Sequence, residues 1–316
     1  MACGNASSVT NTQRIETHFK LSQESTLTNS PSTSTNGKEK LVISIDSQVL
    51  AGIQTCNQQA AYRFIDSIEP RDYSMESIQL GLVLHEAMAE HYSTFHKLPS
   101  NILRNNVATR MESYAAAKTM LSHSQVNALI DIYRQYQAKY ITEDWVVERD
   151  TNDNPLVEST FAKTLYEDAE IHILYTGITD LVLRKPYQVP VDHKSFGTYF
   201  KPAIMSNQFH GYMWALNSRN LIINRIGVKS KTGTFERIVV TKPLSLIEEW
   251  KNDAIRDILR HLDMMHEGNF RRNREACGMY GGCRFINLCS AEPSHRSYLI
   301  ANNYQVVPVW NPLNRD

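Results

Sequence analysis

Cysteine is scarce in this sequence of 316 residues, which has only five, and neither sign of charge is in excess, because 33 Lys and Arg balance 33 Asp and Glu. Five cysteines are too few for a disulfide scaffold in a chain of this length. The zero net charge excludes a polybasic binder of nucleic acids, although it leaves room for a locally basic cleft. The sequence also lacks a secretory signal and a run of about 18 apolar residues, so we expect an intracellular protein without a membrane-spanning helix. The cysteines therefore need another explanation.

The hydrophobic pattern divides the chain into three regions. Residues 1–40 are rich in Ser, Thr and Asn and poor in large apolar side chains, which predicts a disordered tail. Residues 41–292 switch between helical and strand periodicity, which predicts one mixed α/β domain. Residues 293–316 form a C-terminal extension that we expect to pack back on this domain. Within the domain we predict helices at residues 53–68, 76–96, 102–120, 125–140, 203–216 and 244–268, and strands at residues 145–148, 156–165, 171–183, 189–195, 221–228 and 235–241.

Two aspartates and a lysine come together in one predicted hairpin. If its turn centres on Pro186, antiparallel pairing places Asp180 opposite Asp192, with Cβ atoms about 4.5–5.5 Å apart. Lys194 follows Asp192 by two residues and so shares its face of the strand. The apolar neighbours indicate a strand pair covered on both faces, where close carboxylates repel unless a cation such as Mg²⁺ or Mn²⁺ lies between them. A solvated hairpin, in which Lys194 pairs with either aspartate, remains the alternative.

Two predicted helices carry further polar residues. His85 lies on an apolar face of its helix, where a packed histidine is the alternative to a metal ligand. A zinc-protease motif that starts at His85 would need a second histidine at position 89, where this chain has Ala89. Gln208 and Tyr212 are four residues apart and therefore share one face of their helix.

In chain order, these motifs resemble the signature of the PD-(D/E)xK nuclease superfamily, and of its RecB-type branch in particular. The signature is present as GxxxH at residues 81–85, GxxD at 177–180, DxK at 192–194 and QxxxY at 208–212. The DxK motif has Asp192 where many of these nucleases have Glu, which is a recognised variant. The resemblance spans about residues 53–290. It implies a restriction-endonuclease-like α/β core, a mixed central sheet flanked by helices, with an N-terminal helical region and a cysteine-bearing loop at its C-terminal end.

The same resemblance implies a role for each residue of the motifs. The catalytic Mg²⁺ or Mn²⁺ ion would be bound by His85, Asp180, Asp192 and the main-chain carbonyl of His193. Lys194 would position or activate the attacking water, and Gln208 and Tyr212 would steady the site or the DNA. Phosphodiester hydrolysis needs a nucleophilic water and a neutralised phosphoryl oxygen, and a bound metal ion can supply both.

Three cysteines, Cys277, Cys283 and Cys289, are separated by equal gaps of five residues. The CxxC pairs of zinc ribbons are absent. Together with Cys56, the three resemble the ligands of the [4Fe-4S] cluster in the iron–sulfur nucleases of the same superfamily, which include CRISPR-associated exonucleases, phage-type relatives and helicase–nuclease subunits. The first gap departs from the commoner C-x2-C spacing, so zinc and isolated buried thiols stay open as alternatives. Cys3, in the tail, is expected to be a bystander.

The resemblance as a whole implies a metal-dependent DNA nuclease, in particular an exonuclease that acts on DNA ends or single strands in recombination, repair or replication. Such an enzyme would be cytoplasmic or nucleoid-associated and would work with a helicase or a recombination protein. Two alternatives stay open, a non-catalytic module that keeps the fold and cluster to bind DNA or a partner, and a nuclease directed to RNA. Basic stretches at residues 225–237 and 269–277 could grip phosphates, with solvated surface charge as the alternative, and aromatic residues such as Tyr62 could stack on bases, with core packing as the alternative.

Overall fold

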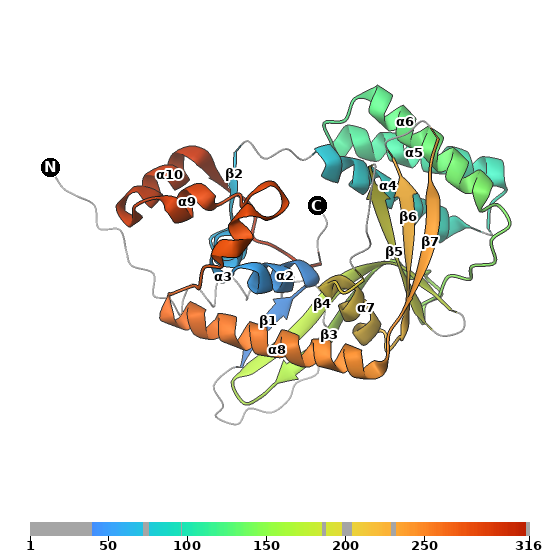
Figure 1. Cartoon of the computed structure of the whole chain (residues 1–316). Coiled ribbons are helices and arrows are strands. Elements are labelled where there is room, and N and C mark those ends of the chain that lie inside the picture. The colour runs from blue at the N-terminus through green and yellow to red at the C-terminus, as the bar shows by residue number, and fades with distance from the viewer. Residues whose placement is uncertain are drawn as a thin grey trace. The chain divides into compact units, whose positions relative to one another are not determined.

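The computed structural model describes residues 40–71, 76–95, 97–184, 188–197, 204–228 and 232–313. They form an α/β fold in which helices flank a six-stranded mixed sheet (Figure 1), and this confirms the predicted fold class. The chain divides into two compact units: unit 1 holds residues 1–73, 162–177 and 249–316, and unit 2 holds residues 74–161 and 178–248. The tail with Cys3 and the predicted turn at residues 185–187 lie outside the described residues. No helix in the described ranges is long and apolar enough to cross a membrane.

Unit 2 contains the strand pairs that carry the predicted hairpin. Its strands are the first half of β3 (Val157–Glu167), the second half of β4 (Ile171–Leu183), β5 (Val189–Phe196), β6 (Asn220–Gly227) and β7 (Phe235–Thr241). β4 pairs antiparallel with β5, β5 pairs in parallel with β6, and β6 pairs antiparallel with β7. Leu181 lies opposite Val191, which is the register expected for a turn centred on residue 186.

The described part of unit 2 also holds four complete helices, and apolar stripes on three of them form its core with the sheet. They are α4 (Glu76–Thr94), α5 (Ser100–Lys118), α6 (His123–Lys139) and α7 (Asn207–Ala215). Ser122 begins α6 with a capping box, in which its hydroxyl accepts from the N–H of Gln125 while the Gln125 side chain accepts from the N–H of Ser122. Side chains such as Val83 of α4 and Tyr133 of α6 are fully buried against Leu181 of β4.

Unit 1 is built from the first and last parts of the chain around the first half of β4. Its regular elements are β1 (Leu41–Ile45), α2 (Ser47–Thr55), α3 (Asn57–Ala60), a π-helical turn (Ala61–Ile65), β2 (Ile68–Pro70), most of α8 (Leu244–Glu267), two 3₁₀ turns (Arg274–Gly281 and Pro293–His295), α9 (Ile286–Ser290), α10 (Arg296–Asn303) and β8 (Tyr304–Val306). β1 pairs in parallel with β4, and β2 pairs antiparallel with β8. α8 ends where expected, because Gly268 takes the left-handed φ of 66° that favours glycine.

Two predicted elements differ from those observed, and one observed strand was not predicted. The predicted helix at residues 53–68 is wrong as one helix, since Cys56 is extended at φ −165° and separates α2 from α3. Residues 145–148 form only a bridge between Val147 and Leu183 rather than a strand. β1 was not predicted, because a five-residue apolar run fits a strand and a buried helix equally well, and its partner strand lies about 130 residues later in the chain.

The C-terminal extension packs in unit 1. Tyr304 is buried beside Tyr62 and Phe285. Trp310 donates from Nε1 to Oδ2 of Asp46, at 3.1 Å, and Asp46 is the N-cap of α2. Burial raises the pKa of Asp46, and these hydrogen bonds oppose that effect by stabilising its charged form. The C-terminal segment therefore stabilises the start of helix α2.

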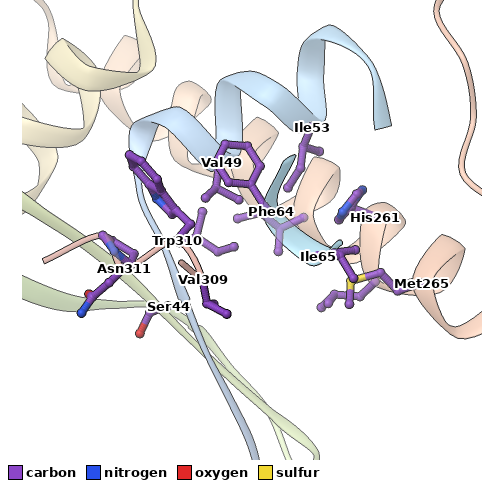
Figure 2. A pocket seen from close by; sticks show the side chains of 14 residues that line it. Ser44, Val49, Ile53, Phe64, Ile65, His261, Met265, Val309, Trp310 and Asn311 are labelled. Atoms are coloured by element: carbon purple, nitrogen blue, oxygen red, sulfur yellow. The ribbon is translucent and has the colours of Figure 1, made fainter. Parts of the chain in front are cut away.

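A largely apolar cavity of about 240 Å³ lies inside unit 1, between α2, the π-helical turn, α8 and the C-terminal segment (Figure 2). Phe64 and Trp310 meet on its wall with ring centroids 5.7 Å apart, and the guanidinium of Arg63 lies over both rings. His261 is the titratable group of its lining, and its Nδ1 lies 2.6 Å from Oδ1 of Asn57. Burial lowers the pKa of His261 from 6.5 to about 4.

This burial predicts an acid-sensitive stability. Unfolded His261 takes up a proton near pH 6.5 and the folded residue only near pH 4, so the free energy of unfolding should fall as the pH drops through that range. His261→Gln should lose less stability between pH 7 and pH 5 than the wild type, as measured by urea denaturation. His266→Gln, at an exposed position of the same helix, should behave like the wild type; equal losses in all three proteins would contradict this account.

Candidate active site

Seven residues predicted from the sequence lie together in unit 2, on four of its elements: His85 on α4, Asp180 on β4, Asp192, His193 and Lys194 on β5, and Gln208 and Tyr212 on α7. The two strands are neighbours in the sheet, and both helices contact β5. The sheet and its two helices therefore bring together side chains that are up to 127 positions apart in the sequence.

The two aspartates are buried side by side. Asp180 is 1% exposed and Asp192 is fully buried. Asp180 Oδ2 accepts a hydrogen bond from the main-chain N–H of His193, at 2.7 Å, and lies 3.4 Å from His85 Nδ1. The described β4–β5 pairing ends at Leu181 and Val191, one residue before the two aspartates. The Asp180 carboxylate therefore accepts the His193 N–H beyond the last paired residues of the two strands.

Lys194 balances the charge of the second aspartate. Its Nζ lies 3.0 Å from Oδ1 and 2.9 Å from Oδ2 of Asp192, and it donates to Oε1 of Gln208 at 2.9 Å. Burial raises the pKa of Asp192 to about 6, and the ammonium of Lys194 opposes this rise. A bound cation would act in the same direction as Lys194 and keep the carboxylate ionised.

Helix α7 is tied to the sheet through a chain of hydrogen bonds. Ser206 caps the helix by accepting from the N–H of Phe209. Gln208 donates from Nε2 to Tyr212 Oη at 3.0 Å, and Tyr212 donates in turn to the carbonyl of Ile178 at 2.6 Å. The Gln and Tyr of the QxxxY motif thus link Lys194 on β5 to the main chain of β4.

Glu158, at the start of β3, is a residue of this site that the sequence motifs did not reveal. Its Oε1 lies 3.9 Å from His85 Nδ1. Ligand atoms of His85, Glu158 and Asp180 all lie within 4.8 Å of one another. Glu158 has a positive φ of 46°, which is rare for a residue other than glycine. No sequence motif identifies Glu158, because its side chain comes close to His85 only through that backbone conformation and the β3–β4 pairing.

These residues fit a divalent cation. The imidazole of His85 and carboxylate oxygens of Glu158 and Asp180 converge, whereas Asp192 lies outside this group and contacts Lys194. Oxygen-rich sites of this kind suit Mg²⁺ and Mn²⁺, and the imidazole adds a ligand that Mn²⁺ accepts more readily than Mg²⁺ does. Burial lowers the pKa of His193 to about 3, so its side chain is neutral and adds no positive charge that would compete with the ion.

The four cysteines Cys56, Cys277, Cys283 and Cys289 line one cavity of about 320 Å³ in unit 1. Each of them is half-buried. Cys56 Sγ accepts from the N–H of Asn273 at 3.4 Å. Burial raises the pKa of Cys283 and of Cys289, while Arg272 favours the thiolate of Cys289. Four thiols around one cavity fit a thiolate-bound metal centre.

These elements and side chains define an α/β protein with a candidate site for a divalent cation. The chain belongs to the PD-(D/E)XK nuclease superfamily, whose family model matches residues 48–290. No curated protein matches it. Among solved structures, a protein of Eubacterium rectale named as a candidate exonuclease is 11% identical, with a TM-score of 0.42, over 74% of this chain and 85% of its own. An alkaline exonuclease of Laribacter hongkongensis is 10% identical, with a TM-score of 0.29, over 60% of this chain and 95% of its own.

The position of Glu158 predicts that it strengthens metal binding. Glu158→Gln removes one carboxylate charge from the ligand group and should weaken Mn²⁺ binding by the DNA-free protein about tenfold. Electron paramagnetic resonance of free Mn²⁺ measures this affinity directly. Glu167→Gln, on the same strand but paired with Lys40, should bind Mn²⁺ like the wild type. An unchanged affinity in Glu158→Gln would exclude Glu158 from the site.

Proposed function

We propose that this protein is a divalent-metal-dependent DNA nuclease, and more narrowly an exonuclease that acts on DNA ends or single strands in recombination, repair or replication. The observation that carries the proposal is the contact of Lys194 with Asp192, next to Asp180 and His85, in a member of the PD-(D/E)XK superfamily. Asp192 is fully buried, and a buried carboxylate is costly to desolvate even when a half-buried lysine pairs with it. A non-catalytic binding module has no need of such a pair, whereas phosphodiester hydrolysis does.

Metal binding is the task of five residues in this proposal. His85, Asp180 and Asp192 would hold the ion together with the main-chain carbonyl of His193, and Glu158 adds a further carboxylate. When bound, the ion would neutralise a phosphoryl oxygen and lower the pKa of the attacking water. The buried aspartates exclude bulk water on their side of the site, which strengthens the electrostatic interactions there.

Lys194 holds the nucleophile in this proposal. Its ammonium has three N–H donors. Asp192 and Gln208 accept from two of them, so the position of Nζ is fixed and the third donor can face the attacking water or a non-bridging phosphate oxygen. Tyr212 keeps Gln208 in place, which makes it a support for Lys194 rather than a group that reacts. The developing negative charge on the phosphorus oxygens would then lie next to a fixed positive charge.

The positions of the basic and aromatic residues narrow the choice of residues that would contact DNA. Of the first predicted basic stretch, Arg225 and Arg237 form ion pairs with Glu236 and Glu143, and residues 229–231 lie outside the described ranges. Tyr62 is buried in the core of unit 1 and cannot stack on a base. In the second stretch, three exposed arginines line a second cavity beside Cys56: Arg271, Arg272 and Arg274. These three are the better candidates for phosphate contacts.

We further propose that the four cysteines of unit 1 hold a [4Fe-4S] cluster. A single zinc ion with Zn–S bonds of about 2.3 Å would bring its thiolates to about 3.8 Å from one another. Among the described residues, the ligand atoms of His85, Glu158 and Asp180 lie within 4.8 Å of one another. No three of the cysteine sulfur atoms lie as close together. Their wider spacing around a cavity favours a larger centre that lies between them. Its role would be structural, since Cys56 and the late cysteines come from opposite ends of the matched region.

The nuclease proposal predicts that cleavage depends on both sides of the ion pair. With Mg²⁺ or Mn²⁺ and end-labelled single- and double-stranded DNA, Asp192→Asn and Lys194→Ala should each lose at least about 100-fold in kcat. Matched exposed variants, Asp131→Asn and Lys118→Ala, should cleave like the wild type. Undiminished degradation in both site variants would show that another site, or a contaminant, is responsible; labelled RNA in parallel tests the RNA-directed alternative.

The cluster proposal predicts a brown protein when it is purified without oxygen, with about four irons per chain. Cys283→Ser should lose colour and iron and unfold at a lower temperature, because a bound centre stabilises the folded state. Cys3→Ser provides the matched control and should keep both. A colourless wild type with one equivalent of zinc would overturn the assignment, and iron and zinc analysis of the same preparation distinguishes the outcomes.

A further inference from the structure

Three polar residues form a row across the sheet of unit 2, beside the site. His193 of β5 pairs with Asn224 of β6, and Asn224 pairs with Arg237 of β7. Directly paired residues point to the same face of a sheet, so these three side chains lie next to one another. Asn224 is fully buried and His193 is 3% exposed. Buried polar groups need hydrogen-bond partners, and for this row the hydroxyls of Tyr92 on α4 and Tyr136 on α6 are among them.

The contacts of the row form one continuous network. Asn224 Nδ2 lies 2.8 Å from His193 Nδ1 and donates to Tyr136 Oη at 2.9 Å. The hydroxyl of Tyr136 lies 2.6 Å from that of Tyr92. Arg237 donates from Nη2 to Tyr136 at 3.1 Å and to Tyr92 at 3.3 Å. Arg237 of β7 thus reaches both α4 and α6, while Asn224 of β6 links Tyr136 of α6 to His193 of β5.

Arg237, the positively charged residue of this network, is held by contacts on several sides. Arg237 forms an ion pair with Glu143, which is only 4% exposed. The Arg237 guanidinium also lies 3.7 Å from the ring centroid of Tyr140 and 3.6 Å from that of Trp145. A planar guanidinium suits this double stacking together with its hydrogen bonds, and lysine could not reproduce it. Arg237 therefore has a single position, which fixes the two tyrosine hydroxyls.

The network reaches the candidate metal site at two points, through Tyr92 on the helix that carries His85 and through His193 next to Asp180. The ring of Tyr92 stacks on that of His193, with centroids 5.6 Å apart and an angle of 7° between the planes. Tyr92 follows His85 by seven residues on α4, which is two helical turns, so both side chains face the sheet. The main-chain N–H of His193 donates to Asp180. Holding the His193 ring and Tyr92 thus sets the distance between the His85 side chain and the carboxylates.

We propose that Tyr92, Asn224 and Arg237 are positioning residues for the divalent cation, which act through His193 and His85 and never touch substrate. The inference rests on the proposed function in one respect, namely that the ion binds at His85, Asp180 and Asp192. Partners that orient metal ligands commonly change metal affinity by about 10- to 100-fold when they are removed. The network is therefore expected to set the affinity for the ion rather than the affinity for DNA.

Asn224→Leu tests the proposal, because leucine is close to asparagine in size and makes neither hydrogen bond. We expect the DNA-free protein to bind Mn²⁺ about tenfold more weakly than the wild type, as measured by electron paramagnetic resonance. At a fixed low Mn²⁺ concentration kcat should fall, KM for DNA should stay unchanged, and added Mn²⁺ should restore kcat. If Asn224→Leu does not fold, Tyr92→Phe, which keeps the ring on His193 and removes one hydroxyl, should show a weaker loss of the same kind.

Gln137→Leu is the matched control for a purely structural effect. Gln137 is 3% exposed, lies next to Tyr136 on α6, and bonds Arg104 and the carbonyl of Ser100 instead. It should lower the melting temperature with wild-type Mn²⁺ affinity. Wild-type Mn²⁺ binding in Asn224→Leu, or equal losses in Gln137→Leu, would overturn the inference even if the protein cleaves DNA. Loss of Mn²⁺ binding in Asn224→Leu, with no cleavage by the wild type, would instead overturn the proposed function alone.

Discussion

The burial of two carboxylates on neighbouring strands is the constraint on which the rest of unit 2 depends. Asp180 and Asp192 repel each other in a place where water cannot screen them, so each needs its own partners. Asp180 has the His193 N–H and His85, and Asp192 has Lys194. These requirements explain why α4, which carries His85, and α7, which supports Lys194, both contact β5. Helix packing and site geometry are consequences of the same electrostatic balance.

The sequence predicted the parts of the site that depend on local pattern. The bounds of β4 and β7 agree with the prediction at both ends, since their alternation is regular, and a turn at Pro186 sufficed to give the β4–β5 register. Contacts made by distant segments could not be predicted. Strand β1 is defined by a partner far along the chain, Glu158 by an unusual backbone angle, and the break at Cys56 by an extended residue inside an otherwise helical pattern.

Unit 1 depends on contacts between the two ends of the chain. β2 near the start pairs with β8 near the end, and Asp46 accepts from Trp310, 264 residues later. Closing so long a loop costs entropy on the order of a few kcal/mol, which these contacts must offset. A centre bound by Cys56 and the late cysteines would close the same loop a second time. The C-terminal segment keeps the two ends of this unit together, and a centre bound by the cysteines would have the same effect.

The row of His193, Asn224 and Arg237 has a consequence for how this protein can change in evolution. Loss of Arg237 alone leaves the buried charge of Glu143 without its counter-ion, and loss of Asn224 alone leaves His193 and Tyr136 without their common partner. Single substitutions at these positions are therefore disfavoured, and neutral drift must pass through coordinated replacements. Among relatives, the positions equivalent to 143, 193, 224 and 237 should covary as a set, so that an alignment would reveal the network even where the individual residues differ.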